Sequence, residues 1–363
     1  MNNPLVSVVT VVCNVERFLA EAIESILAQT FRDFEFIIVD YGSTDGSKSI
    51  ISSLAGKDER IRLHEIAHCT LPEARNAGCF LAHGKYIALL DADNMALPDR
   101  LRWGVEYMEK HPEVGVVGGG MEAIDAAGAP LPNSALPYGS APRPLDNRGL
   151  QSALLSYCAI WQNSVLMRKE AFTSVGGYRA LFLQAEDYDL WLRIAECFEM
   201  ANLKQPVFKL RYHPYQLSVR KRTQQTLCYL AARASAARRK AGQPDALDSA
   251  KEITPAVLTA MGVSDAEQQT ALLYSYCAQV HCMCALGEWS SALNLVMEML
   301  RSSSDWKSVD RRSIADMRLK AARVYWKNNR FSRGICTAGH ALMTRPMLAS
   351  RILKRLFVRP ELS

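Results

Sequence analysis

The stretch GKYIALLDADNMALPDRL, residues 84–101, places a short apolar run directly before two closely spaced carboxylates. Tyr86 to Leu90 have the composition of a buried strand, and Asp91 and Asp93 follow where that strand should end. Two carboxylates this close repel each other unless a positive group lies between them. Hard oxygen ligands of this kind select Mg²⁺ or Mn²⁺, which leave positions open for phosphate oxygens. The pair therefore predicts a divalent-cation site at a strand end; a solvated turn is the alternative reading.

The sequence before this stretch alternates between strand and helix patterns. Apolar runs at VSVVTVV (6–12) and FEFIIVD (34–40) are separated by the amphipathic segment ERFLAEAIESILAQT (16–30), and LPEARNAGCFLAHG (71–84) has a helix start and stop signal. Near-continuous apolar strands that alternate with helices indicate an α/β fold with a mostly parallel sheet covered on both faces. Ligands of such sheets bind beyond the carboxyl ends of the strands, which makes Asp40 a further site candidate.

Composition bounds the class of protein. The chain has 363 residues, 49% of them hydrophobic, which favours two domains. No apolar run approaches the roughly 18 residues of a membrane-spanning helix, and ten cysteines without framework spacing favour a reducing compartment. We therefore expect a cytoplasmic protein.

The C-terminal part of the sequence is helical in pattern and basic. Residues 301–363 hold 15 Lys/Arg against 4 Asp/Glu. The final stretch MLASRILKRLFVRP has a basic amphipathic pattern, which could lie peripherally on the inner face of a membrane or pack as an ordinary terminal helix. No nucleic-acid-binding module accompanies the charge, so we expect no nucleic-acid partner.

Two segments within this helical part resemble each other, ALGEWSSALNLVMEML and KNNRFSRGICTAGHALM, with Trp289 and Phe331 at equivalent positions. They indicate helical hairpins similar to tetratricopeptide repeats. The sequence thus predicts an α/β domain over residues 1–225 and an all-α domain over residues 226–363.

Several motifs occur together in the first domain: VSVVTVVCN, GSTDGS, ARNAG, YIALLDADN, VGGYR and AEDYDLWLRI. In this order and spacing, the chain from about Pro4 to Ser218 resembles the family 2 glycosyltransferases. The resemblance implies the GT-A fold and inverting transfer of a sugar from a nucleotide-sugar donor, most often a UDP-sugar, to a hydroxyl. It also implies a glycan or lipid-linked acceptor, as in the synthesis of cell-envelope polysaccharides, and a divalent cation, Mn²⁺ or Mg²⁺.

The resemblance assigns roles to individual residues on the donor side. Asp91 is expected to approach the ribose of the nucleotide, and Asp93 to bind the cation that bridges the diphosphate. His213 matches a position that can complete the metal site, with a purely structural histidine as the alternative. Asp40 belongs to the nucleotide pocket, and Arg75 is expected near the base or the phosphates.

On the acceptor side the resemblance implies that Asp187 is the general base. One carboxylate suffices to take the hydroxyl proton as the acceptor attacks, and such help is worth about 10²–10⁴ in rate. The alternative is that Asp187, Glu186 or Asp189 caps the helix that follows. For Arg75, the alternative is a surface ion pair with Glu73 or a neighbouring residue.

The chain departs from the family pattern at the nucleotide pocket. Cys13 stands where an aromatic residue is usual, and Tyr41 stands where a carboxylate recognises the edge of the base. We hypothesise that Tyr41 supplies the lost aromatic surface, which weakens UDP selectivity because stacking tolerates different bases. Trp161 lies in the acceptor-side motif, where it could stack on a sugar ring or belong to the core.

Other functions remain to be weighed. The changes at Cys13 and Tyr41 would also suit a degenerate member that binds nucleotide-sugars or serves as an assembly module. The residues that oppose this reading are the intact Asp91, Asp93, Glu186 and Asp187. GGGMEA (118–123) fits a dinucleotide signature, but the residues that follow cannot sustain the required helix. A nucleotidyltransferase would need a glycine-rich phosphate loop after the first strand, which CNVERF does not provide.

Overall fold

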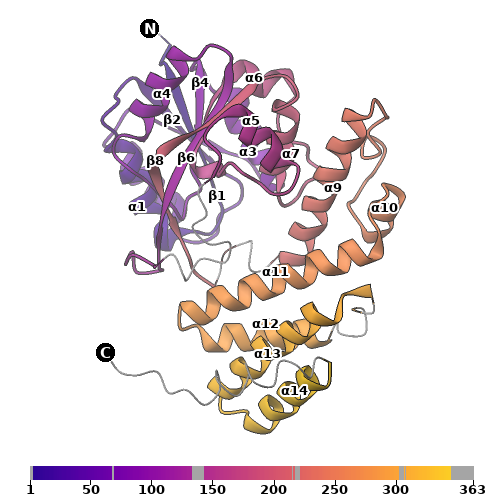
Figure 1. Ribbon diagram of the computed structural model, residues 1–363. Helices are drawn as coiled ribbons and strands as arrows, with labels where there is room; N and C mark the ends of the chain where they lie inside the picture. Colours follow the sequence, from indigo (N-terminus) through magenta and orange to yellow (C-terminus); the bar gives the residue numbers. More distant parts are fainter. Residues whose placement is uncertain are drawn as a thin grey trace. The chain divides into compact units, whose positions relative to one another are not determined.

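The computed structural model (Figure 1) describes residues 3–67, 69–132, 143–214, 216, 221–301, 306 and 308–344. The chain divides into two compact units. The first comprises Met1–Leu131, Ala141–His213 and Leu227–Val257, and the second comprises Pro132–Ser140, Pro214–Thr226 and Leu258–Ser363. The first unit therefore includes Leu227–Val257, which the sequence pattern places in the helical domain.

Eight strands form one mixed sheet in the order β3-β2-β1-β4-β7-β6-β8-β5. Their bounds are β1 Val6–Val12, β2 Phe34–Asp40, β3 Ile61–Glu65, β4 Tyr86–Leu89, β5 Met95–Ala96, β6 Val114–Ile124, β7 Leu166–Arg168 and β8 Glu199–Arg211. Strand β1 pairs in parallel with β2 and β4, β2 with β3, and β6 with β8. Strand β7 lies antiparallel between β4 and β6, and β5 is antiparallel to β8. The mostly parallel sheet predicted from the sequence is confirmed.

Helices cover both faces of this sheet in the first unit. Their bounds are α1 Glu16–Leu27, α2 Ser47–Ala55, α3 Leu71–Leu81, α4 Arg100–Lys110, α5 Asn147–Leu154, α6 Lys169–Ser174 and α7 Glu186–Ile194, with a 3-10 turn η2 at Gln162–Ser164. Successive strand residues point to opposite faces. Val8 therefore packs in the cluster that contains Leu19 of α1, whereas Val9 faces Gly78 of α3. Because both faces are covered, every residue of β1 and β2 is buried.

The triple glycine at residues 118–120 lies inside β6, which continues to Ile124 without a following helix. The rejection of a dinucleotide-binding loop is therefore confirmed. A Cβ atom on Gly118 would lie 2.3 Å from Oδ1 of Asn202 on the neighbouring strand β8. Glycine is required here because the two strands approach closely at irregular register.

A buried ion network ties residues 227–257 to α7. Asp189 of α7 is fully buried and pairs with Arg179 and with Arg193 on the next turn. Arg179 also pairs with Asp245 at 2.7 Å, and Asp245 accepts from Arg239 of helix α9 (Arg222–Lys240) at 3.0 Å. These contacts explain why this segment belongs to the first unit.

Asp245→Asn should lower the free energy of unfolding by about 2 kcal/mol at neutral pH. Burial alone would raise the pKa of Asp245, but hydrogen bonds from Ser235, the Leu247 amide and Arg179 lower it from 3.8 to about 2. A carboxyl with a lowered pKa stabilises the fold at pH values above its pKa in the unfolded chain. The difference in free energy of unfolding between the native chain and Asp245→Asn should therefore shrink as the pH falls from about 4 towards 2. Denaturant unfolding at a series of pH values measures this.

Glu106→Gln is the matched control, because Glu106 forms an exposed pair with Arg102 and should contribute no more than about 1 kcal/mol. If Asp245→Asn lowered the free energy of unfolding no more than Glu106→Gln does, or by an amount that did not change with pH, the network would not stabilise the fold as stated.

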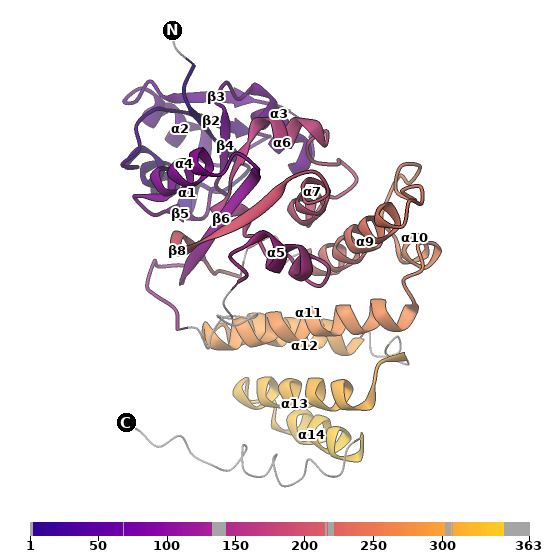
Figure 2. The same ribbon diagram turned by 45° about the horizontal axis from the view of Figure 1, so that its top comes forward.

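The second unit contains two helical hairpins (Figure 2). Helix α11 (Asp265–Ala285) packs on α12 (Trp289–Arg301), and α13 (Arg311–Lys327) packs on α14 (Phe331–Thr344). Trp289 and Phe331 begin the second helix of each hairpin, as the repeat predicts. Two residues before each aromatic, Gly287 and Asn329 both have positive φ, 75° and 57°. The hairpin turns are therefore equivalent in structure, whereas the tetratricopeptide label stays a hypothesis.

The basic stretch at 347–360 lies outside the described residues, so its predicted membrane contact remains an expectation. A further short helix, α10, spans Pro255–Ala260. Among the described residues, no helix combines the length and apolar character needed to cross a bilayer.

Candidate functional site

The carboxyl ends of β1, β2 and β4 bring the predicted donor-side residues to one edge of the sheet. The strands are parallel, and Val12 lies opposite Asp40 in the register of β1 and β2. Asp40 therefore ends its strand beside the loop that carries Cys13, and the loop with Asp91 and Asp93 follows β4 on the other side of β1. This arrangement is the one predicted from the apolar runs.

The loops after β1 and β2 are fixed by side chains that accept backbone hydrogen bonds. Asp40 Oδ1 accepts from the amides of Gly42 and Ser43 at 3.0 and 2.9 Å, and Gly42 has a φ of 109°, which glycine adopts without strain. Asn14 Oδ1 accepts from the Thr44 amide at 2.8 Å. The second oxygen of Asp40, Oδ2, is buried and has no partner among the described residues. A buried acceptor of this kind is costly unless a ligand group meets it.

Both oxygens of Asp91 are held by the protein. Oδ1 accepts from Arg75 Nη2 at 2.6 Å, and Oδ2 accepts from Asn163 Nδ2 at 2.8 Å. Asn163 Oδ1 in turn accepts from the Asp91 amide at 2.6 Å. The carboxylate is therefore oriented before any ligand arrives, and its side chain remains 33% exposed.

Arg75 lies at the centre of the site. Its buried guanidinium pairs with Asp91 after β4 and with Glu186 at the start of α7. Gln162 lies within 2.6–3.0 Å of the same guanidinium, and its amide is satisfied when the oxygen faces Arg75 and the nitrogen donates to Tyr178. Burial alone would lower the pKa of Arg75, but the charges of Asp91 and Asp187 raise it. Arg75 therefore stays charged and joins the two acidic elements.

Arg75 is therefore buried in the site and does not form the surface ion pair that was the alternative for it. Glu73 instead closes a capping box at the start of α3, where it accepts from the Thr70 amide and hydroxyl at 2.7 Å.

Three acidic residues lie at the start of α7, and none of them caps the helix through its side chain. Glu186 pairs with Arg75, and Asp189 pairs with Arg179 and Arg193. Asp187 has no ion-pair partner in the part of the chain that is described, and Oδ1 accepts only the Tyr188 amide at 2.8 Å. Of the three carboxylates, it alone is available to a substrate.

The environment of Asp187 favours its protonated form relative to an ordinary aspartate. Burial raises the pKa of this carboxyl, the Asp91 charge raises it further, and Arg75 offsets part of the shift. A raised pKa suits a general base that must accept a proton. Ala185, immediately before the helix, has a φ of 57°, a left-handed conformation that is strained for alanine, and strained residues of this kind cluster at functional sites.

Asp93 and His213 lie together on the other side of Asp91. His213 Nε2 is 3.2 Å from Asp93 Oδ2, and Asn94 Nδ2 donates to Asp93 Oδ1 at 2.7 Å. The His213 ring contacts the Phe18 ring, with centroids 4.8 Å apart. The buried Arg211 donates to the Asp93 carbonyl at 3.1 Å, which fixes the loop.

This pair fits a divalent cation. Two ligands at adjacent positions of an octahedral ion with bonds of about 2.1 Å are separated by about 3 Å, close to the Asp93–His213 distance. The described residues contain no group of three or more His, Cys, Asp or Glu side chains placed to hold a metal. A carboxylate and an imidazole would therefore leave most of the coordination to phosphate oxygens and water.

Tyr41 and Cys13 lie close to each other at the predicted nucleotide pocket. Burial raises the pKa of Tyr41 to about 12, and Cys13 contributes to the shift. The pKa of Cys13 is likewise raised by burial and by Asp40 and Asp45. Both groups are therefore neutral at physiological pH, so Tyr41 cannot replace the charge of the usual carboxylate.

Three contacts of the site were not identified from the sequence. Asn163 and Gln162, which hold Asp91 and Arg75, lie in WQNS, a turn that carries no charge and whose distant partners the sequence does not reveal. Glu186 was considered as a cap and is an ion-pair partner of Arg75. For Trp161 the sequence left two alternatives, a core residue or a residue that stacks on a sugar ring. Its side chain is partly exposed, so it is not a core residue.

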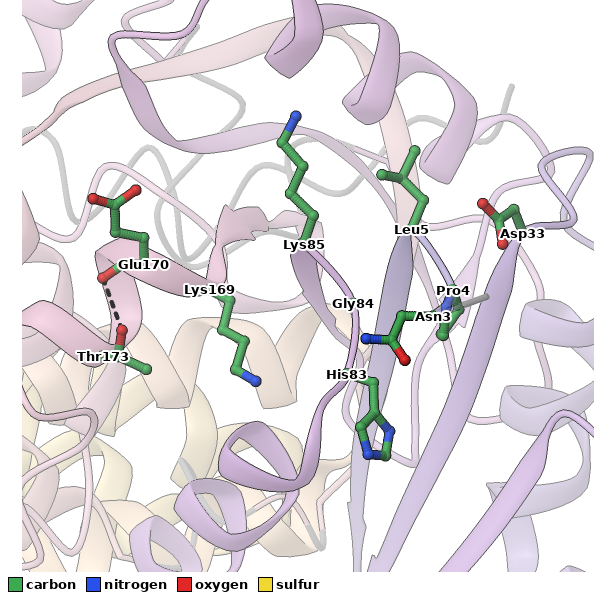
Figure 3. A pocket seen from close by; sticks show the side chains of 10 residues that line it. All are labelled: Asn3, Pro4, Leu5, Asp33, His83, Gly84, Lys85, Lys169, Glu170 and Thr173. Atoms are coloured by element: carbon green, nitrogen blue, oxygen red, sulfur yellow. Dashed lines mark hydrogen bonds between the residues drawn. The ribbon is translucent and has the colours of Figure 1, made fainter. Parts of the chain in front are cut away.

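A pocket of about 650 Å³ lies at the opposite ends of the strands (Figure 3). Its lining includes Leu5, Asp33 and Gly84, which precede β1, β2 and β4. Because these strands are parallel, the pocket is at their amino ends, far from the predicted site residues. It contains none of the residues that the sequence indicates for chemistry.

Comparisons with known proteins agree with this fold. The model of the family described as "Glycosyl transferase family 2" matches residues 7–175. EpsE of Bacillus subtilis (strain 168), which is named as a glycosyltransferase, is 35% identical over 215 residues, covering 58% of this chain and 74% of EpsE.

Two solved structures share the fold at low sequence identity. TarS 1-349 of S. aureus, in complex with UDP-GlcNAc, is 14% identical with a TM-score of 0.52, covering 92% of this chain and 90% of that chain. The mannosyltransferase PcManGT of Pyrobaculum calidifontis, in complex with GDP-Man and Mn²⁺, is 17% identical with a TM-score of 0.51, covering 95% and 89%. The GT-A-type fold expected from the motifs is confirmed.

Proposed function

The chain belongs to glycosyl transferase family 2, and on that premise we propose that it is an inverting, cation-dependent enzyme. It moves a sugar from a nucleoside diphosphate donor to an acceptor hydroxyl. The observation that carries the proposal is the placement of Arg75, which joins the donor-side Asp91 to Glu186, the neighbour of Asp187. Asp91 and the residue next to the candidate base thus meet at one guanidinium.

On the donor side, each residue has a stated task. Asp93 and His213 would hold the cation, and Asp91, oriented by Asn163, would meet the ribose. The unpartnered Oδ2 of Asp40 would accept a hydrogen bond from the nucleotide. The cation, when bound, stabilises the negative charge that develops on the departing diphosphate. The UDP-GlcNAc and the GDP-Man with Mn²⁺ in the two similar structures support a nucleotide-sugar donor and a divalent ion.

On the acceptor side, Asp187 would accept the proton of the attacking hydroxyl. Its raised pKa increases its basicity, and its lack of an ion-pair partner among the described residues leaves the carboxylate accessible to substrate. Direct attack with a single base inverts the anomeric centre, so no protein nucleophile is needed. The acceptor is proposed to be a glycan or a lipid-linked saccharide of the cell envelope, reached from the cytoplasmic side of the membrane.

The proposal is tested by incubating the full chain with UDP-, GDP- and dTDP-sugars, Mn²⁺ or Mg²⁺, and candidate acceptors. Mass spectrometry should detect a glycosylated product, and a chelator should abolish it. Metal-dependent nucleotide binding without any product across the panel would favour a degenerate, binding-only member instead.

The donor panel also tests Tyr41. If its ring supplies the base-stacking surface, Tyr41→Ala should weaken nucleoside diphosphate binding by about 1–3 kcal/mol, whereas Tyr41→Phe should bind like the native chain. The native chain should accept more than one nucleotide. Calorimetric titration of UDP, GDP and dTDP measures both effects, and strict UDP selectivity would count against the stacking account.

A further inference from the structure

Arg143 is a half-buried cation with no carboxylate partner in residues 143–214 or elsewhere in the described chain. Its guanidinium carbon lies 3.9 Å from the centroid of the Trp161 ring and 5.9 Å from that of Tyr157. Nη1 donates to the carbonyl of Cys158. The ten residues before it, 133–142, contain no Asp or Glu.

Other arginines of the first unit with little exposure have more partners. Arg75, Arg179, Arg193 and Arg211 pair with carboxylates, and Arg100 donates to two backbone carbonyls. A guanidinium has five N–H donors, yet Arg143 uses one of them on a described residue. Burial lowers the pKa of Arg143, and the groups that partly offset this shift are a thiol and tyrosine hydroxyls, not carboxylates.

The position of Arg143 connects it to the candidate base. The Cys158 carbonyl accepts a hydrogen bond from Arg143. Burial raises the pKa of the Cys158 thiol, the Asp187 charge raises it further and Arg143 lowers it, so both charged groups act on Cys158. The same segment continues through Trp161 to Gln162, which contacts Arg75. Helices α5 and α7, which flank this segment in the sequence, lie near each other in both views (Figures 1 and 2).

The acceptor must present its hydroxyl to Asp187. We therefore expect side chains near Asp187 that do not contact the donor-side carboxylates, such as Arg143, to contact the acceptor. A neutral acceptor would bury the Arg143 guanidinium without neutralising its charge, and the desolvation of an unpaired charge is costly. An oxyanion would instead receive charge-assisted hydrogen bonds from two N–H groups of the planar fork, while Trp161 supports its face.

We propose that Arg143 binds an oxyanion carried by the acceptor, a phosphate or a carboxylate, so that the enzyme glycosylates an anionic saccharide. The inference rests on the proposed function, since it names the class of acceptor for the same site. It gives the aromatic residues Tyr157 and Trp161 a role in orienting the guanidinium.

The test compares three matched hexoses: glucose, glucose 6-phosphate and glucuronate. Each is titrated by calorimetry into the full chain without donor and with a chelator, so that neither turnover nor a cation contributes. The native chain should bind the two anionic sugars more tightly than glucose. Arg143→Gln should lose this preference, a change of about tenfold or more, as expected for a lost charge-assisted hydrogen bond. Arg143→Lys, which keeps the charge but not the fork, should be intermediate.

Asp33→Asn, which changes an exposed acid before β2, is the control and should keep the preference for anionic sugars. Far-UV circular dichroism and the melting temperature establish that the Arg143 variants are folded. Equal affinity of the native chain for the three sugars, or an unchanged preference in Arg143→Gln, would overturn the proposal. A preference for phosphate over carboxylate, or the reverse, supports it and identifies the oxyanion.

Kinetics separate this role from a structural one. With an acceptor that the enzyme glycosylates, Arg143→Gln should raise KM for the anionic acceptor with little change in kcat. It should leave KM for a neutral analogue of that acceptor unchanged. A rise in both KM values would show that Arg143 only supports the loop and would overturn the inference. If no sugar is transferred but the anion preference persists, the transfer activity fails while the oxyanion site stands.

Discussion

Asp187→Asn is expected to reduce kcat for sugar transfer about 10²–10⁴-fold, the range typical for loss of a general base. Asparagine preserves the shape of the side chain and can accept the Tyr188 amide, but it cannot take the proton of the acceptor hydroxyl. Nucleoside diphosphate binding should be unchanged, because Asp93 and His213 are intact. Steady-state kinetics and calorimetric titration of UDP measure the two quantities separately.

The pH dependence of transfer provides a second readout of the same residue. A general base works when deprotonated, and burial raises the pKa of Asp187. The rate of the native enzyme should therefore fall on the acid side, with a midpoint above the value of an ordinary aspartate, and the residual rate of Asp187→Asn should lack this limb.

Asp33→Asn serves as the matched control, because Asp33 is an exposed acid before β2, at the opposite end of the strand. It should leave both kcat and the pH profile unchanged. If Asp187→Asn retained native kcat while the control behaved as expected, Asp187 would not be the base.

Asp93→Ala is expected to abolish the strengthening of nucleoside diphosphate binding by Mn²⁺. Loss of a residue that merely supports a ligand typically costs 10–100-fold in metal affinity, so loss of one of two protein ligands should cost at least about 100-fold. His213→Ala should weaken the same effect, because its Nε2 lies 3.2 Å from Asp93 Oδ2. UDP titrations over a range of Mn²⁺ concentrations measure this.

The control for Asp93 is again Asp33→Asn, which should bind UDP and Mn²⁺ as the native chain does. UDP affinity that depends on Mn²⁺ to the same extent in Asp93→Ala as in the native chain would contradict the assignment of the cation site.

That Asp40 and Asp91 lie at the same edge of the sheet could be predicted, because both follow the ends of parallel strands. The apolar runs before Asp40 and Asp91 define parallel strands, and parallel strands bring their carboxyl ends to one edge. The role of Asp187 came from the resemblance of AEDYDLWLRI to the family, since an acid at a helix start is equally typical of a cap.

What the sequence could not predict are the partners that join distant elements. Arg75 pairs with Glu186, 111 positions away, and Asp91 is held by Asn163, 72 positions away. Such pairs depend on how the helices close over the sheet and leave no local pattern. The same holds for Asp189 and Asp245, whose contacts place residues 227–257 in the first unit rather than in the helical one.

The most direct measurement is the anomeric configuration of the product, determined by NMR after transfer from an α-linked nucleotide-sugar. A single carboxylate that deprotonates the acceptor for direct attack predicts a β-linked product, formed only with a divalent cation. An α-linked product would require an intermediate or a different course of attack, and would contradict the account in which Asp187 acts alone as base.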